Sequence, residues 1–167
     1  MNIFRIVLGK QHRFFSDCTS NNYVGVDFLM DIDFSDDLPE NWRDFNKKYI
    51  PAYLDIHPSA SKIKAGLACG AIHTLSKFLD EGDYILSPDG KGKYHLGEIA
   101  GGYHYVESSE VPFLRHRRKV KWLNKTFDRA DMSESLRNSA GSISTLCNLT
   151  QYSEEVLNLI GEVASEP

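Results

Sequence analysis

Short runs of hydrophobic and polar positions recur along the chain, and their period predicts a fold of mixed α+β class. Runs rich in β-branched and aromatic residues, each bounded by Gly, Pro or Asp, are typical of strands. Six strands are expected, at residues 4–8, 23–28, 84–86, 93–99, 103–106 and 117–122. The pair Gly101-Gly102 is expected to separate two of these strands, and the polar residues 10–22 are expected to form a loop.

Helical spacing of apolar residues predicts a helix that opens at Pro39, a residue suited to a first helical turn. It carries an aromatic stripe of Trp42, Phe45 and Tyr49, which is more typical of a core than of a ligand site. Pro51 is expected to interrupt the segment that follows, because proline removes a backbone hydrogen bond in a helix interior.

A second helix is predicted from Ser59 or Ser61 to about residue 79. Its apolar face is expected to comprise Ile63, Leu67, Ala71, Leu75 and Phe78. Glycine in a helix interior costs about 1 kcal/mol. Gly66 and Gly70 therefore indicate a close approach of this helix to a sheet or a ligand. Two short helices are expected later, one capped by Ser133 and one over residues 153–163.

Because strands and helices do not alternate regularly, a doubly wound parallel sheet is not expected. The pattern predicts instead a small, mixed, partly closed β-barrel with flanking helices. The chain of 167 residues is 41% hydrophobic, enough to bury the core of one domain. No apolar run approaches the ~18 residues of a spanning helix, and residues 1–6 lack the features of a secretion signal. Three widely spaced cysteines predict neither disulfides nor a zinc finger, so a cytoplasmic location is expected.

The charge distribution is uneven, although the formal net charge of −4 by itself argues against nucleic-acid binding. Segment 91–129 carries nine Lys and Arg residues against four Asp and Glu residues. Five of the seven residues from Arg115 to Lys121 are basic. Since a ligand feels the field within a Debye length of ~10 Å, such a segment is compatible with phosphate contact. An ordinary solvated strand is the alternative interpretation.

Motifs of common catalytic centres are missing from the sequence. We find no phosphate-binding glycine loop, no Gly-x-Ser-x-Gly motif and no His pair at a metal-ligand spacing. A metal-dependent nuclease needs an acid and then Glu-x-Lys on a strand, but after Asp89 the candidate is Glu98-Ile99-Ala100, without the lysine. We therefore expect no enzyme, no cofactor and no metal site.

Binding chemistry is better supplied, because the chain carries the parts of a pocket for an extruded base. Such a pocket needs aromatic walls, polar groups for the base edge and cations for the flanking phosphates. The wall candidates are Phe28, Tyr103, Tyr105 and Trp122, and the edge candidates are Asp27 and Ser87. The phosphate-binding candidates are Arg115, Arg117, Arg118, Lys119 and Lys121. For Tyr103, Tyr105 and Trp122 taken singly, a place in the core is the favoured alternative. An acid such as Asp27 in an apolar strand is costly unless it is at the strand end, paired or functional.

The motifs at 25–28, 65–70, 81–90, 94–105 and 115–122 together resemble a known module. The sequence is similar to the amino-terminal module of Mrr-like restriction endonucleases, which belongs to the PUA superfamily near the EVE and YTH domains. The resemblance extends over most of residues 23–150. Relatives often carry a tryptophan soon after the strand glycine, where this chain has Phe28.

This resemblance implies a PUA-like domain over residues 1–150 that binds nucleic acid, with residues 151–167 as a C-terminal helix and tail and a candidate linker to a further domain. It implies a recognition module of a restriction or defence system that takes a methylated DNA base into its pocket and directs a nuclease domain. An RNA-binding PUA-like module and a protein-interaction domain remain alternatives, and a stand-alone nuclease is the weakest. Neither the modified base nor the oligomeric state follows from the sequence.

Overall fold

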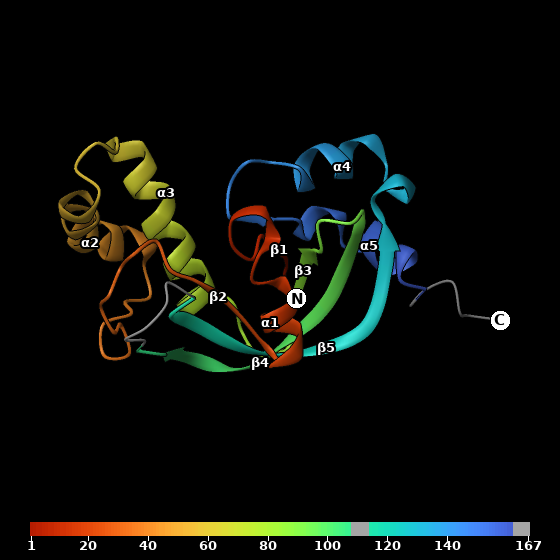
Figure 1. Ribbon diagram of the computed structural model, residues 1–167, viewed down its shortest axis with the longest axis horizontal. Helices are drawn as coiled ribbons and strands as arrows, with labels where there is room; N and C mark the ends of the chain where they lie inside the picture. Colours follow the sequence, from red (N-terminus) through yellow and green to blue (C-terminus); the bar gives the residue numbers. More distant parts are fainter. Residues whose placement is uncertain (108–113, 162–167) are drawn as a thin grey trace.

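One mixed sheet of six strands, in the order β2-β5-β4-β3-β1-β6, organises the protein (Figure 1). The computed structural model describes residues 1–107 and 114–161. The strands are β1 (Ile3–Ile6), β2 (Tyr23–Val26), β3 (Tyr84–Pro88), β4 (Lys93–Tyr105), β5 (His116–Asp128) and β6 (Leu146–Asn148). β1 pairs in parallel with β3, and the other neighbours are antiparallel.

The predicted α+β class is confirmed, but the sheet is not closed into a barrel. Its edge strands, β2 and β6, do not pair with each other within the described residues. The long strands β4 and β5 form a curved ribbon (Figure 1). Their register shifts twice, between His95 and Gly97 and between Ile99 and Tyr103. Such bulges increase the local bend and twist of a sheet.

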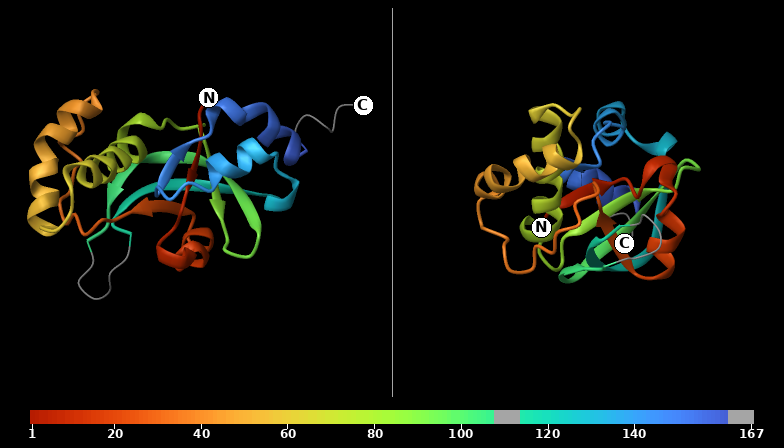
Figure 2. Two further views of the ribbon diagram at one scale, coloured as in Figure 1. Left: turned by 90° about the horizontal axis from the view of Figure 1, so that it is seen from above. Right: turned by 60° about the vertical axis from the view of Figure 1, so that its left-hand side comes forward.

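The described helices are α1 (Phe15–Ser20), α2 (Trp42–Ile56), α3 (Lys62–His73), α4 (Glu134–Ala140) and α5 (Ser153–Leu159). Four of them lie in two groups near opposite ends of the sheet, α2 with α3 and α4 with α5, and α1 lies between them (Figure 2). α3 continues into a wider π turn at Thr74–Phe78, and short 3₁₀ turns occupy Lys10–His12, Arg129–Asp131 and Thr150–Tyr152. No helix in the described ranges is long and apolar enough to cross a membrane.

Side-chain caps begin three of the helices. The Ser61 hydroxyl accepts a hydrogen bond from the Lys64 N–H at 3.1 Å, and Ser133 caps α4 in the same way through the Leu136 N–H. Both serines were expected as caps. Asn41 caps α2 by accepting from the Arg43 N–H at 2.8 Å. These short polar side chains satisfy N–H groups that have no partner inside the helix.

Several predicted boundaries were wrong. Pro51 lies inside α2 on its exposed side, where water can satisfy the carbonyl that loses its partner. Gly101 and Gly102 lie in the second register shift, so the two expected strands form the single strand β4. The expected loop at 10–22 contains α1, whose Cys18 is fully buried. The part of the C-terminal prediction at 162–167 lies outside the described residues.

The predicted apolar face of α3 and its π turn was correct for Leu75, which is fully buried, but wrong for Ile63, Leu67 and Phe78. Ile63 and Leu67 are 78% and 65% exposed, whereas Ile72 is fully buried. The helix contributes small residues to the core, Ala65, Ala68 and Cys69. It packs closely on α2, where the Asn46 amide donates to the Gly66 carbonyl at 3.2 Å. The apolar side chains of Ile63 and Leu67 are therefore left exposed.

Two isoleucines of α3 provide a matched test of this orientation. We expect Ile72→Ala to lower the free energy of unfolding by about 2–5 kcal/mol, because it leaves a cavity in the core. Ile63→Ala, the same chemical change at an exposed site, should change it by less than about 0.5 kcal/mol. Urea unfolding of both variants measures the difference. Equal losses would contradict the orientation of α3.

Candidate functional site

The turn that follows β2 has an unusual backbone. The Met30 N–H donates to the Asp27 carbonyl at 3.0 Å, and both residues between them are left-handed, Phe28 with φ 54° and Leu29 with φ 59°. Turns of this hand normally use Asn or Gly. For other residues the left-handed conformation costs roughly 1–2 kcal/mol each. Such strain persists where surrounding contacts hold it, often at ligand sites.

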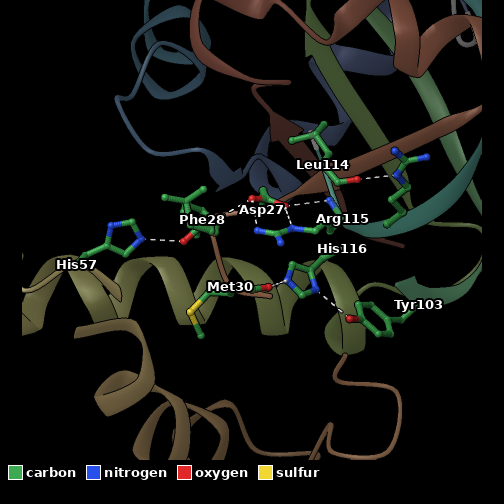
Figure 3. A network of polar contacts seen from close by, with 10 residues as sticks. Asp27, Phe28, Met30, His57, Tyr103, Leu114, Arg115 and His116 are labelled. Carbon is green, nitrogen blue, oxygen red and sulfur yellow. Dashed lines mark hydrogen bonds and ion pairs between the residues drawn. The ribbon is translucent and has the colours of Figure 1, made fainter. Parts of the chain in front are cut away.

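An ion pair holds the first residue of this turn to β5 (Figure 3). Asp27 Oδ1 accepts from the Arg115 backbone N–H at 3.1 Å and from its Nε at 2.7 Å, and Asp27 Oδ2 accepts from Arg115 Nη2 at 3.0 Å. The side chains are only 14% and 18% exposed. The hydrogen bonds from Asp27 raise the pKa of Arg115 further above its usual value. Both carboxylate oxygens are thus occupied by the protein itself.

His116 and His57 hold the rest of the turn (Figure 3). His116 Nε2 donates to the Met30 carbonyl at 2.7 Å, and His116 Nδ1 accepts from the Tyr103 hydroxyl at 2.8 Å. Burial lowers the pKa of His116, which favours the neutral ring that this arrangement requires. His57 Nε2 donates to the Phe28 carbonyl at 2.8 Å. Phe28 is therefore presented by a turn that is fixed on several sides.

Phe28 lies where two cavities meet, and together we call them the cleft. One part, the basic arm, has a volume of about 600 Å³ and lies between the β2 exit, the segment at 9–14 and the segment at 143–145. Its aromatic lining consists of Phe14, Phe28 and Tyr53, and its basic lining of Lys10, Arg13 and Lys64. Ser144 and Thr145 supply polar groups.

The basic arm carries uncompensated positive charge. Lys10, Arg13 and Lys64 are exposed, and none forms an ion pair with another described residue. The acid in its lining, Asp27, is already neutralised by Arg115. A charged groove of this kind attracts anions, and the attraction weakens as salt is added.

The second part, the apolar arm, has a volume of about 650 Å³ and runs between α3 and residues 143–146. It shares its lining at Phe28, Tyr53, Lys64, Ile143, Ser144 and Thr145 with the basic arm. Trp42 and Leu67 form part of its exposed apolar wall. Gly66 and Gly70 also line it, and nothing lies within 4 Å of the place where a Gly70 Cβ would stand. The helix glycines thus border a cavity and do not approach the sheet closely, so the ligand remains the untested one of the two expected alternatives.

Of the predicted base-pocket residues, only Asp27 and Phe28 line the cleft. Ser87 is fully buried and donates to the Ile6 carbonyl at 3.0 Å, so it reaches no cavity. Tyr103 borders a separate hollow of about 420 Å³ with Lys77 and Ser35. The other two predicted walls make internal contacts. The Tyr105 ring packs 5.3 Å from that of His116, and Trp122 Nε1 donates to the Cys18 carbonyl at 3.1 Å.

The predicted phosphate-binding strand is used mainly inside the protein. Arg118 is 4% exposed and donates to the carbonyls of Leu75, Leu79 and Gly101. Arg115 pairs with Asp27, and the Arg117 guanidinium carbon stands 3.9 Å from the centre of the Tyr23 ring. Lys119 and Lys121 are exposed to solvent. Alternation along β5 explains why Arg118 is buried while Lys119 and Lys121 are exposed, since neighbouring side chains point to opposite faces.

Most residues of the cleft were not predicted from the sequence. They are Lys10, Arg13, Phe14, Tyr53, Lys64, Ser144 and Thr145. The feature of the sequence that could have indicated part of this cleft is Gly9 followed by two cations, Lys10 and Arg13, in a polar segment. That feature gives no indication that residues 53, 64 and 144 lie opposite it, because their proximity depends on how the helices pack.

The fold and its cavities define an α+β domain with a basic, aromatic-lined cleft. A family model described as a domain of unknown function, DUF8426, matches residues 4–150. The chain belongs to this family. A search of the curated proteins found no match.

A double-mutant cycle tests the ion pair that anchors the turn. We expect Asp27→Asn and Arg115→Gln each to lower the free energy of unfolding by about 1–3 kcal/mol, because each leaves a largely buried partner unpaired. The double variant should lose less than the sum, by at least about 1 kcal/mol. Urea unfolding measures all four proteins. Strictly additive losses would show that the pair does not stabilise the turn.

Proposed function

We propose that this domain binds nucleic acid and takes one extruded base into the cleft against Phe28. The observation that carries the proposal is the basic arm, in which three aromatic rings and three unpaired cations line one cavity. Base stacking on aromatic rings contributes roughly 1–3 kcal/mol per base. Cations at the same opening suit the phosphates that flank an extruded nucleotide.

The dimensions and rigidity of the cleft support this proposal. Volumes of about 600 and 650 Å³ lie within the roughly 300–1,000 Å³ of small-molecule sites. The ring of Phe28 is held by a strained turn with four polar anchors, so little ordering is needed on binding. Pre-organisation of this kind favours a specific ligand over general surface adhesion.

We propose further that the base is methylated and belongs to DNA, as the resemblance to PUA-like modules of restriction systems implies. The apolar arm supports this choice, because Leu67 and Ile143 offer a surface on which a methyl group gains about 0.8 kcal/mol by burial. The curved β4–β5 ribbon and the α+β class are compatible with the PUA-like type. A nuclease domain or subunit would supply cleavage, and the cytoplasm remains the predicted location.

An RNA ligand is the second candidate, since a stacking pocket beside cations does not distinguish the two sugars. The exposed apolar residues Trp42, Leu67 and Ile143 at the rim would also suit a protein partner. Both possibilities are outcomes of the titrations below.

Titration of labelled oligonucleotides tests base recognition directly. We expect a methylated duplex to bind at least about tenfold more tightly than its unmethylated counterpart. Phe28→Ala should remove most of this difference in affinity. Phe15→Ala is the matched control, because Phe15 is similarly half-buried but packs on His95 and Trp122 away from the cleft. RNA of the same sequence serves as competitor. Equal affinity for every duplex, unaffected by Phe28→Ala, would contradict the proposal.

The salt dependence of binding shows which cations contact phosphate. Lys10→Gln combined with Arg13→Gln should weaken binding to all sequences and reduce the slope of log affinity against log salt by about 1–2. Lys119→Gln combined with Lys121→Gln removes the same charge from the exposed face of β5 and should leave the slope unchanged. The reverse result would assign the phosphate contacts to β5 instead of the cleft.

A further inference from the structure

A smaller cavity of about 290 Å³ lies beside the cleft, and we call it the turn cavity. It is bounded by β1, the turn between β3 and β4, and the residues that follow α4. Its polar lining consists of Arg5, His12, Lys93, Tyr94, Arg129 and Ser142. Val7 lines both the turn cavity and the basic arm. No Asp or Glu is among its described lining residues.

Arg5 is a buried cation in the wall of the turn cavity. Its side chain is 1% exposed, and its guanidinium donates to the carbonyls of Ala140 and Ser142 at 2.8 and 2.9 Å and to that of Ser144. These acceptors are neutral, and no carboxylate in the described chain forms an ion pair with Arg5. Its Nε–H is buried without a partner. A buried charge without a counter-charge is costly.

Further positive groups surround the same cavity. Burial raises the pKa of Tyr94, while the positive charges of Arg5 and Arg129, together with a hydrogen bond from Arg129, act in the opposite direction. Arg129 is exposed and its side chain is available at the opening. Lys93 pairs with Asp128 at 3.0 Å. The positive charges of Arg5 and Arg129 therefore remain without a carboxylate partner here.

A strained segment brings His12 to this cavity. Gln11 and His12 are left-handed, with φ of 57° and 58°. The His12 ring packs on Gly90, where an added Cβ would lie 2.9 Å from the ring carbon Cδ2. His12 Nδ1 is buried without a partner, like Arg5 Nε. Arg5 and His12 both line this cavity, and each carries one buried polar atom without a partner, which is unusual because buried polar groups are nearly always hydrogen-bonded.

We infer that the turn cavity is a binding site for a phosphate group, held by Arg5 and Arg129 with His12 beside them. Guanidinium groups match the geometry of phosphate oxygens and hold them by paired hydrogen bonds. A phosphate monoester carries about −1.5 to −2 charges at neutral pH, which complements two arginines. The volume lies just below the roughly 300–1,000 Å³ typical of drug-sized ligands, so a small anionic group fits better than a whole nucleoside.

This site does not rest on the proposed base pocket, since the phosphate can belong to a small molecule or to the end of a nucleic-acid strand. Isothermal titration with inorganic phosphate tests the shared chemistry without any oligonucleotide. A pair of oligonucleotides of one sequence, with a 5′-phosphate or a 5′-hydroxyl, then distinguishes the two sources.

We expect the wild-type protein to bind inorganic phosphate and Arg129→Gln to weaken that binding about tenfold or more, because an ionised hydrogen-bond donor is lost. Arg129 is exposed, so the variant should fold. Lys47→Gln, which removes one exposed charge on α2, is the control and should bind as the wild type does. Arg5→Lys keeps the buried charge but loses the planar fork, and should also weaken binding while near-ultraviolet circular dichroism reports its fold.

If a 5′-phosphate strengthens oligonucleotide binding, and Arg129→Gln removes this gain, the ligand is the end of a nucleic-acid strand. Phosphate binding without such a gain would identify a small phosphate compound. Equal phosphate affinity of the wild type and Arg129→Gln, or no binding of inorganic phosphate and no effect of the 5′-phosphate, would overturn the inference. Loss of discrimination between bases would leave this result untouched, so the two proposals fail separately.

Discussion

The ion pair between Asp27 and Arg115 is the interaction on which the rest of the cleft depends. It ties the end of β2 to the residue before β5, at the point where the chain must reverse through two left-handed residues. Phe28 and Leu29 would not hold that conformation on their own intrinsic preferences. Because the pair is largely buried and satisfied at both oxygens, it restrains the turn and the backbone that carries Phe28.

The segment at 9–13 shows how one strained loop can serve two cavities. Left-handed residues at Gly9, Gln11 and His12 turn the chain so sharply that successive side chains diverge. Lys10 and Arg13 reach the cleft, while His12 reaches the turn cavity. A regular helix or strand could not distribute neighbouring side chains in this way. The strained backbone therefore directs the basic side chains of this segment to two cavities, and such strain is often found at functional sites.

Basic residues in this protein have two different uses, and the count of Lys and Arg in a segment does not show which use each residue has. Arg118 is buried and donates to backbone carbonyls far from it in sequence. Arg5 does the same, although its Nε–H has no partner and its side chain also lines the turn cavity. Lys10, Arg13 and Lys64 are exposed around a hollow and keep their charge available to a ligand. The local field at the cleft is therefore positive, although the whole chain has a formal net charge of −4.

Local chemistry determined what could be predicted from the sequence. The α+β class follows from the period of apolar residues. The caps at Ser61 and Ser133 follow from the need of a helix to satisfy its first N–H groups. The expectation that Asp27 is paired or functional follows from the cost of an acid in an apolar strand, and Asp27 is paired. The tertiary structure alone decided which face of α3 is buried and which arginines are internal. It also decided that residues 10, 53, 64 and 144 meet around one hollow. These outcomes depend on how distant segments pack against one another, and the sequence of a single segment carries no information about that packing.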